Sequence, residues 1–334
     1  AQLVTNGAVQ AGQWHTLLQL DKLQGQLRGY PVSGQVDVLL REAALTINTL
    51  VLTSANNQLS ASGKLDEQWN ITANADIADM AAVLPGWAGQ LSLAGTLTGA
   101  RERPVINATL DATGLAGAGL SVETVVAQAA IDRHELAEQS ITASAAGLVL
   151  AGQAYESATV DISGSLHAHR LSLSTTGKEA DVDVALAGNW TDPLWRGTLE
   201  KADWQYPGAG EWRLHQPVAL ELGTTHIALP ETCWIQEDAR LCADAAGEFA
   251  AGLETGVRLE SFPLSALRAL EEAPVTLDNR VEADMRAALH AGLLKAADLQ
   301  VRLGAGSVTY ADPTLPAETR LGGGVLQATL DDTG

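Results

Sequence analysis

The sequence predicts a mainly β protein, a long antiparallel sheet curled into an open groove with two or three short helices. Apolar and polar residues alternate with a period of two along most of the 334 residues, which places apolar side chains on one face of each strand. Turn-forming residues, chiefly glycine, recur roughly every 10 to 15 positions and divide the chain into many short strands. One face of the sheet is therefore aliphatic, and the other carries Asp, Ser, Arg, Glu and Ala.

The aliphatic members of the alternating segments define the face that we expect to matter for function. They share branched or small apolar side chains and lie two residues apart within each expected strand. We predict that this face is formed by Val36, Val38, Leu91, Leu93, Ile106, Leu110, Val160, Ile162, Leu171, Leu173, Val182, Val184, Leu186, Val218, Leu220, Leu222, Val257, Leu259, Val301 and Leu303.

Two stretches break the alternation and predict short helices. Residues 76–85 begin with acidic residues and stop at Pro85, as expected for a helix start and end. Residues 262–271 have apolar residues at i, i+3 spacing and Pro263 near the first turn. No linker-like tract divides the chain, so we expect residues 1–334 to form one continuous elongated groove segment. Both ends stop within the pattern, which predicts a piece of a longer protein.

The charge balance excludes several classes of partner. The chain has 20 Lys and Arg against 40 Asp and Glu, a net charge of −20. Without a basic stripe it should bind neither nucleic acid nor an anionic membrane surface. No stretch of about 18 residues is continuously apolar, so no transmembrane helix is predicted.

The two cysteines, Cys233 and Cys242, flank a polar stretch that reads as a hairpin loop. Facing residues of antiparallel strands bring their Cα atoms to about 4.5 Å at a non-hydrogen-bonded pair, which is within disulfide reach. The spacing fits neither a CxxC redox motif nor a zinc site. We therefore predict a disulfide and an oxidising compartment, with two buried free thiols as the alternative.

Catalytic motifs are not found. The glycine clusters form no phosphate-binding loop and no nucleophile elbow occurs, so the sequence predicts no enzyme, cofactor or metal site. The tryptophans Trp190, Trp195, Trp204 and Trp212 are expected to cap the open end of the sheet core, and stacking on sugars is the alternative.

The aliphatic face must be covered, because its exposed apolar area would otherwise far exceed the few hundred Å² that are usual for an apolar patch on a soluble protein. The sheet either closes into a dry sandwich, barrel or solenoid, or curls into an open trough with apolar contents. Aromatics make up only 4% of the chain, which favours a trough, because large rings would block it.

Several segments resemble the TamB family, relatives of the AsmA-like group. The most specific is a Cys-Trp…Leu-Cys block with an upstream Trp and Pro. The matching segments are Leu84-Pro85, Gly95 to Gly99, Gly164 to His169, Gly188, Trp195 to Leu199, Trp212 to Leu214, Pro217 to Leu220, Cys233-Trp234 and Leu241-Cys242.

This resemblance implies a protein anchored in the inner membrane of Gram-negative bacteria by an N-terminal helix that this sequence lacks. It implies a central periplasmic segment of a long sheet bent into a groove (a β-taco) that conducts phospholipids between the membranes in outer-membrane biogenesis. The expected partners are phospholipid acyl chains and, through a region outside this sequence, a TamA-like outer-membrane barrel.

Two other functions are left open. The groove would instead serve as a chaperone or assembly scaffold if its strand edges templated outer-membrane β-barrel or autotransporter proteins by β-augmentation. A secreted β-solenoid or adhesin passenger with a closed, dry core would contain no cavity and no lipid.

Overall fold

The computed structural model describes residues 3–10, 13–27, 29–41, 44–132, 137–150, 152–178, 180–191, 193–206, 209–266, 275–310, 314 and 318–331. The chain divides into two compact units, Ala1–Leu166 and His167–Gly334, which we call unit 1 and unit 2. Almost all described residues lie in antiparallel strands, and the sheet does not close into a barrel. The predicted fold class is confirmed.

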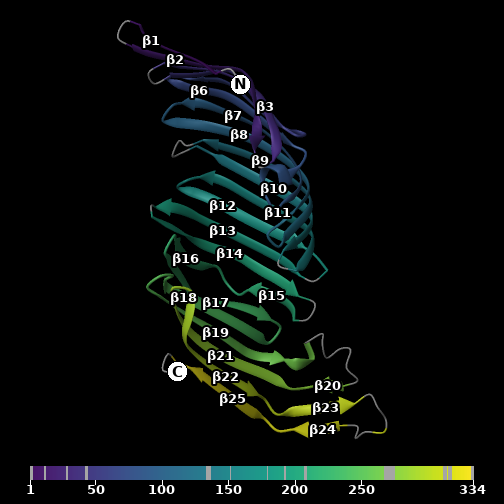
Figure 1. The fold of residues 1–334 in the computed structure, drawn as a ribbon. Coiled ribbons are helices and arrows are strands. Elements are labelled where there is room, and N and C mark those ends of the chain that lie inside the picture. The colour runs from purple at the N-terminus through teal and green to yellow at the C-terminus, as the bar shows by residue number, and fades with distance from the viewer. Residues whose placement is uncertain are drawn as a thin grey trace. The chain divides into compact units, whose positions relative to one another are not determined.

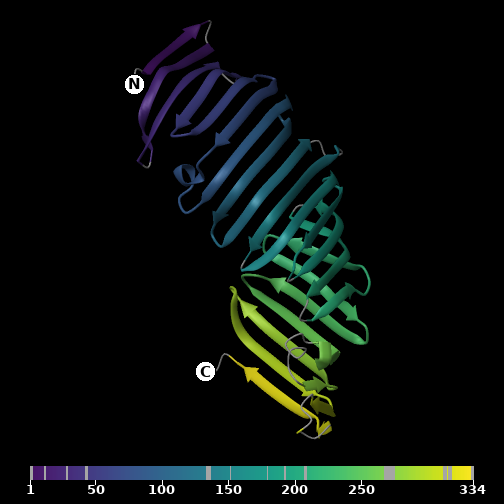
Figure 2. The same cartoon turned by 90° about the vertical axis from the view of Figure 1, so that its right-hand side faces the viewer.

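Unit 1 is a single antiparallel sheet whose strands pair in chain order, so each strand lies beside the next one in the sequence (Figure 1, Figure 2). Each strand is long enough to carry several apolar residues on one face. The strands are β1 (Leu3–Gln10), β2 (Gln13–Leu27), β3 (Tyr30–Arg41), β4 (Ala44–Ser54), β5 (Asn57–Leu65), β6 (Gln68–Ile77), β7 (Ala88–Ala100), β8 (Arg103–Gly117), β9 (Leu120–Asp132), β10 (Gln139–Leu150) and β11 (Gln153–Ser165).

Tight turns set the chain-order pairing. The β8–β9 turn has positive φ at both Ala118 (51°) and Gly119 (79°), the type I′ geometry that matches the twist of a hairpin. Register shifts interrupt the β2–β3, β3–β4 and β4–β5 ladders. Such bulges bend strands and increase their twist, which curves the sheet at its β2–β5 end.

A single helical turn, α1 (Met80–Val83), connects β6 and β7. The Asp79 carboxylate caps it by accepting a 3.0 Å hydrogen bond from the Ala81 N–H. The Asn57 side chain, only 4% exposed, fastens the turn to β5 through two hydrogen bonds with the Asp79 backbone, of 3.0 and 2.9 Å. The helix lies inside the expected range 76–85, of which residues 76 and 77 still belong to β6.

Unit 2 has eleven described strands in its main sheet and three in a small second sheet. The main strands are β12 (Ala168–Thr176), β13 (Asp181–Thr191), β14 (Leu194–Tyr206), β15 (Gly210–Leu214), β16 (Val218–Gly223), β17 (His226–Gln236), β18 (Ala239–Glu248), β19 (Gly252–Pro263), β21 (Arg280–His290), β22 (Leu293–Leu303) and β25 (Gly324–Leu330); the small sheet has β20 (Val275–Leu277), β23 (Gly306–Tyr310) and β24 (Glu318–Leu321).

In the range 262–271, residues 262 and 263 end β19, and Leu264–Ala266 form the 3₁₀ turn η1. The remainder of this expected helix lies outside the described residues. The expectation of one continuous groove over residues 1–334 stays a prediction.

Candidate functional site

The apolar face of unit 1 can be followed directly through the strand registers, because residues paired across an antiparallel ladder lie on the same face. One row of paired residues crosses ten neighbouring strands, from β2 to β11, without a charged or polar side chain. Its members are Leu20, Val36, Leu50, Ala61, Ala73, Gly95, Ala108, Ala129, Ile141 and Ile162.

Large aliphatic side chains flank this row on both sides. On one side, Ile71 pairs with Leu97 and Leu97 with Ile106. On the other, Leu93 pairs with Leu110. The eight residues predicted in this part of the chain all lie on the same face: Val36, Val38, Leu91, Leu93, Ile106, Leu110, Val160 and Ile162.

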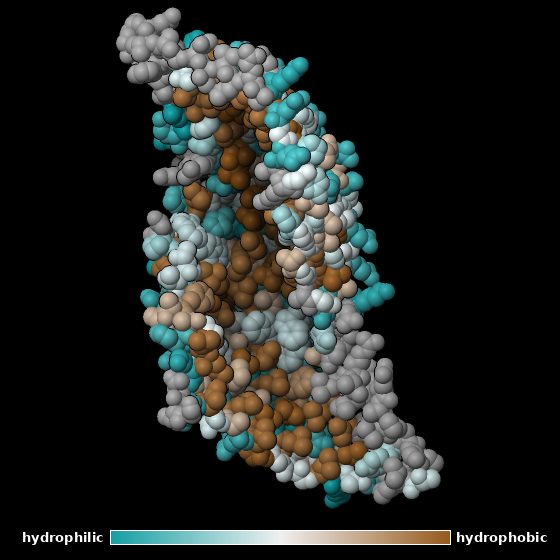
Figure 3. All heavy atoms as spheres, viewed as in Figure 1, coloured by the Kyte–Doolittle hydropathy of each residue, from teal (hydrophilic) through white to brown (hydrophobic). Residues whose placement is uncertain are grey.

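This face is not covered by other described parts of unit 1. Leu93 is 39% exposed and Ile106 is 36% exposed, and the other six predicted residues are half-buried. Figure 3 shows hydrophobic residues gathered along a hollowed surface over β6 to β9. Each large aliphatic left in water forfeits about 1.5–3 kcal/mol of burial free energy, so the face favours an apolar occupant.

Unit 2 has an apolar face of the same kind. Leu171 pairs with Leu186, which pairs with Leu199 and then Val218; Leu173 pairs with Val184. The twelve residues predicted in this unit share one face of its sheet: Leu171, Leu173, Val182, Val184, Leu186, Val218, Leu220, Leu222, Val257, Leu259, Val301 and Leu303. The lower part of Figure 3 shows hydrophobic residues over β19, β21 and β22.

Part of the unit 2 face is closed by an aromatic cluster. Trp212 stacks on Trp204 at 5.5 Å and on Phe262 at 6.0 Å between ring centroids. Trp212 is 2% exposed and Phe262 is 7% exposed. Leu241 and Leu259 pack against them. This end of the sheet is therefore a dry core, and the pattern of aliphatic residues gave no signal for it.

Trp195 lies flat on the same face, over two glycines. A Cβ atom at Gly188 or Gly197 would overlap its indole ring, so the glycines provide the space that the ring occupies. The indole N–H donates a 2.6 Å hydrogen bond to Nε2 of His169, which fixes the ring in this orientation. Trp195 therefore contributes to the floor of the face, whereas Trp190 is 42% exposed.

Some members of the face carried little sequence signal. Leu50 lies within the run 44–52, where the register shift between Ile47 and Leu50 obscures the alternation. Ala61, Ala73 and Ala108 belong to the central row, but alanine occurs on both faces and does not mark either. Leu97 and Ile141 lie in stretches where apolar and polar residues alternate, so the sequence could have identified them as members of this face.

Charged side chains lie on the opposite face. Lys201 contacts Asp183 at 2.6 Å, and Arg196 contacts Glu221 at 2.9 Å. The hydrogen bond that the Lys201 ammonium donates to the Asp183 carboxylate raises the pKa of Lys201. These ion pairs are exposed, so each contributes little to the free energy of unfolding. They show that one face of the sheet is charged and solvent-exposed, whereas the other is uncharged and apolar.

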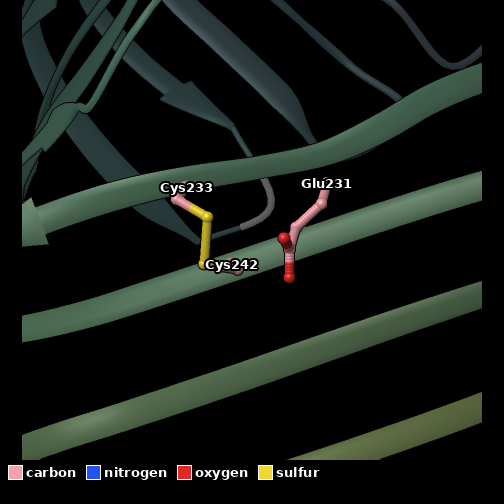
Figure 4. Close-up of side chains that lie close together, drawn as sticks. All are labelled: Glu231, Cys233 and Cys242. Carbon is pink, nitrogen blue, oxygen red and sulfur yellow. A yellow bond between two sulfur atoms is a disulfide. The ribbon is translucent and has the colours of Figure 1, made fainter.

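The disulfide lies on the charged face of unit 2. Cys233 and Cys242 are directly paired on β17 and β18, are bonded to each other, and have Cα atoms 4.0 Å apart (Figure 4). Both are buried, at 7% and 3% exposure. Glu231 lies close to both sulfur atoms, but a disulfide offers no thiolate to a metal ion. The role of the two cysteines is therefore to link β17 and β18 covalently.

Loss of the disulfide should lower the free energy of unfolding of unit 2. The bridge joins two cysteines that lie nine positions apart, and closing a loop of this size stabilises by about 2–3 kcal/mol on the chain-entropy model. Urea unfolding of the Cys233→Ala/Cys242→Ala variant, followed by circular dichroism, measures the effect. Dithiothreitol should destabilise the parent chain but leave the variant unchanged, and equal midpoints for parent and variant would contradict the prediction.

No described helix has the length and apolar character needed to cross a bilayer. A family model described as "TamB, N-terminal domain" matches residues 1–333. No solved structure matches the chain. Since the family match covers almost the whole sequence, the chain belongs to the TamB family, a family of periplasm-spanning transport and assembly proteins.

Proposed function

We propose that the apolar faces of both units bind phospholipid acyl chains, and that the protein conducts phospholipids across the periplasm between the inner and outer membranes. The lipid headgroups would stay in water at the open edge of the groove, while the acyl chains move along the aliphatic residues. The supporting observation is the row of ten uncharged, apolar residues across β2 to β11. No covalent chemistry is needed: the predicted aliphatic residues would solvate lipid tails, apart from Leu259, which packs against the aromatic cluster, and Val218, which is only 7% exposed.

We also propose that the whole chain acts as one groove segment of a longer protein, and that this protein is anchored in the inner membrane. A TamA-like outer-membrane barrel would bind through a region outside residues 1–334. The disulfide fits an oxidising periplasm, and the acidic exterior keeps the outer face away from anionic membrane surfaces.

A role as an assembly scaffold is the second candidate, and the strand pairing favours it less. β-Augmentation requires an open strand edge, but the strands from β2 to β10 each pair with neighbours on both sides. The backbone groups of these strands are therefore already used, and the apolar face is the surface that they leave available.

Site-specific photo-crosslinking in cells separates the two functions. A benzoyl-phenylalanine at Leu93 or Leu171, on the apolar faces, should capture phospholipid, identified by mass spectrometry. The matched positions Ser92 and Ser172 are exposed on the opposite faces and should capture none. Capture of unfolded outer-membrane proteins rather than lipid at Leu93 and Leu171 would favour the scaffold, and equal lipid capture at all four positions would contradict a lipid-binding face.

A further inference from the structure

The polar face of unit 1 contains a hollow of about 480 Å³ over β6 to β10. Two rows of paired residues form its sides, and Gly95, Ala108 and Ala129, which lie between the two rows, also line it. One row is Asn74, Ala94, Thr109, Gln128 and Thr142; the other is Thr72, Thr96, Asn107, Ala130 and Ser140. The small side chains of Ala94 and Ala130 make the hollow deeper at two positions. The other eight side chains in these rows all end in amide or hydroxyl groups.

None of these eight side chains forms a hydrogen bond with another group of the described chain. Each amide offers two donors and an acceptor, and each hydroxyl offers one donor and accepts as well. Nearby polar residues are used differently, since Ser92 donates a 2.9 Å hydrogen bond to Asp76. The hollow therefore presents a regular array of unengaged donors and acceptors.

The hollow is also free of charge. The adjacent row on one side contains Asp76 and Asp111, and the row on the other contains Lys64 and Asp132. Asp161 on β11 pairs with Thr142 just beyond the lining. In a chain of net charge −20, an anionic ligand would be repelled. A cationic ligand would find no carboxylate in the lining. The chemistry that fits is a neutral ligand with many hydroxyl and amide groups.

We propose that this hollow binds a neutral, extended β-1,4-linked glycan chain that lies across the strands. Neighbouring strands are about 4.8 Å apart, close to the rise per sugar of such a chain, so successive sugars would meet successive strands. Asn107 and Gln128 lie on adjacent strands in different rows and would hold the sugar hydroxyls and acetamido groups from both sides. This site is on the face opposite the acyl-chain face, so it does not depend on the proposed lipid function.

Isothermal titration of the 334-residue chain with chitohexaose, a neutral β-1,4-linked hexasaccharide, tests the proposal. We expect saturable binding, and roughly tenfold weaker binding for Asn107→Ala and for Gln128→Ala, because each loses a set of hydrogen bonds. The matched variant Asn70→Ala changes an exposed asparagine of the same face on β6 that does not line the hollow and should bind as the parent does.

A sulfated hexasaccharide of similar length should not bind. Absence of chitohexaose binding, or equal affinity in the parent and the Asn107→Ala/Gln128→Ala double variant, would overturn the proposal. Lipid capture at Leu93 should be unchanged in the double variant, so the glycan site and the lipid function can fail independently.

Discussion

A carboxylate at position 184 is expected to remove lipid from unit 2 while the sheet stays folded. Val184 lies on the apolar face between Leu173 and Ala202 and is half-buried. Without lipid, an aspartate there keeps part of its hydration. With an acyl chain against it, the charge loses water and gains no partner, which is strongly unfavourable. A cost of roughly 1.4 kcal/mol already gives a tenfold loss of binding.

The measurement is the amount of phospholipid captured by a benzoyl-phenylalanine at Leu171 on the unit 2 face of Val184→Asp, with the circular dichroism spectrum as the test of folding. Ser172→Asp is the matched control, since Ser172 lies on the neighbouring strand, is exposed and points to the charged face. We expect at least a tenfold loss of capture at Leu171 for Val184→Asp and the parent level for Ser172→Asp, whereas lipid on the face of unit 1 should be unchanged in both. A folded Val184→Asp protein with full lipid capture at Leu171 would count against the acyl-chain proposal.

Removal of the Trp212 side chain is expected to have the largest effect on stability. The indole is almost fully buried between Trp204 and Phe262, and its N–H donates a 2.9 Å hydrogen bond to the Ala209 carbonyl. Truncation of a buried aromatic residue to alanine costs about 3–5 kcal/mol. We therefore expect Trp212→Ala to shift the urea unfolding transition of unit 2 to much lower denaturant.

Trp190→Ala provides the comparison within the same sheet. Trp190 is 42% exposed, so its truncation should lower the free energy of unfolding by less than about 1 kcal/mol. Equal shifts for the two variants would show that the aromatic stack is not the core of unit 2.

The face to which each predicted aliphatic residue points could be predicted from the sequence, because the β-bulges do not interrupt the alternation of these residues. At the β3–β4 shift, for example, the extra residue is Asn48 on β4, so Val36 and Val38 keep the alternation of β3. Similarly, the shift between β13 and β14 places the extra residue, Glu200, on β14. Leu186 therefore stays in phase with Val184.

The sequence predicted that Trp204 and Trp212 cap the sheet core, but it could not predict that Phe262 joins them. A bulge on β19 between Leu259 and Phe262 turns Phe262, rather than Ser261, to the apolar face. Ser261 has a φ of 54° there, a backbone conformation that local sequence does not specify for serine. Trp204, Trp212 and Phe262 then meet through strand pairing over a long stretch of chain, and no short-range pattern encodes that contact.

The pairing of the unit 1 strands in chain order also makes assembly directional. Every strand from β2 onward finds its partner in the strand made just before it, so the contacts are short in sequence and quick to form. A chain that emerges N-terminus first can fold hairpin by hairpin without waiting for distant segments. Gain or loss of one hairpin would change the length of the sheet by two strand spacings and leave its apolar side intact, so evolution can adjust the reach of such a protein in small steps.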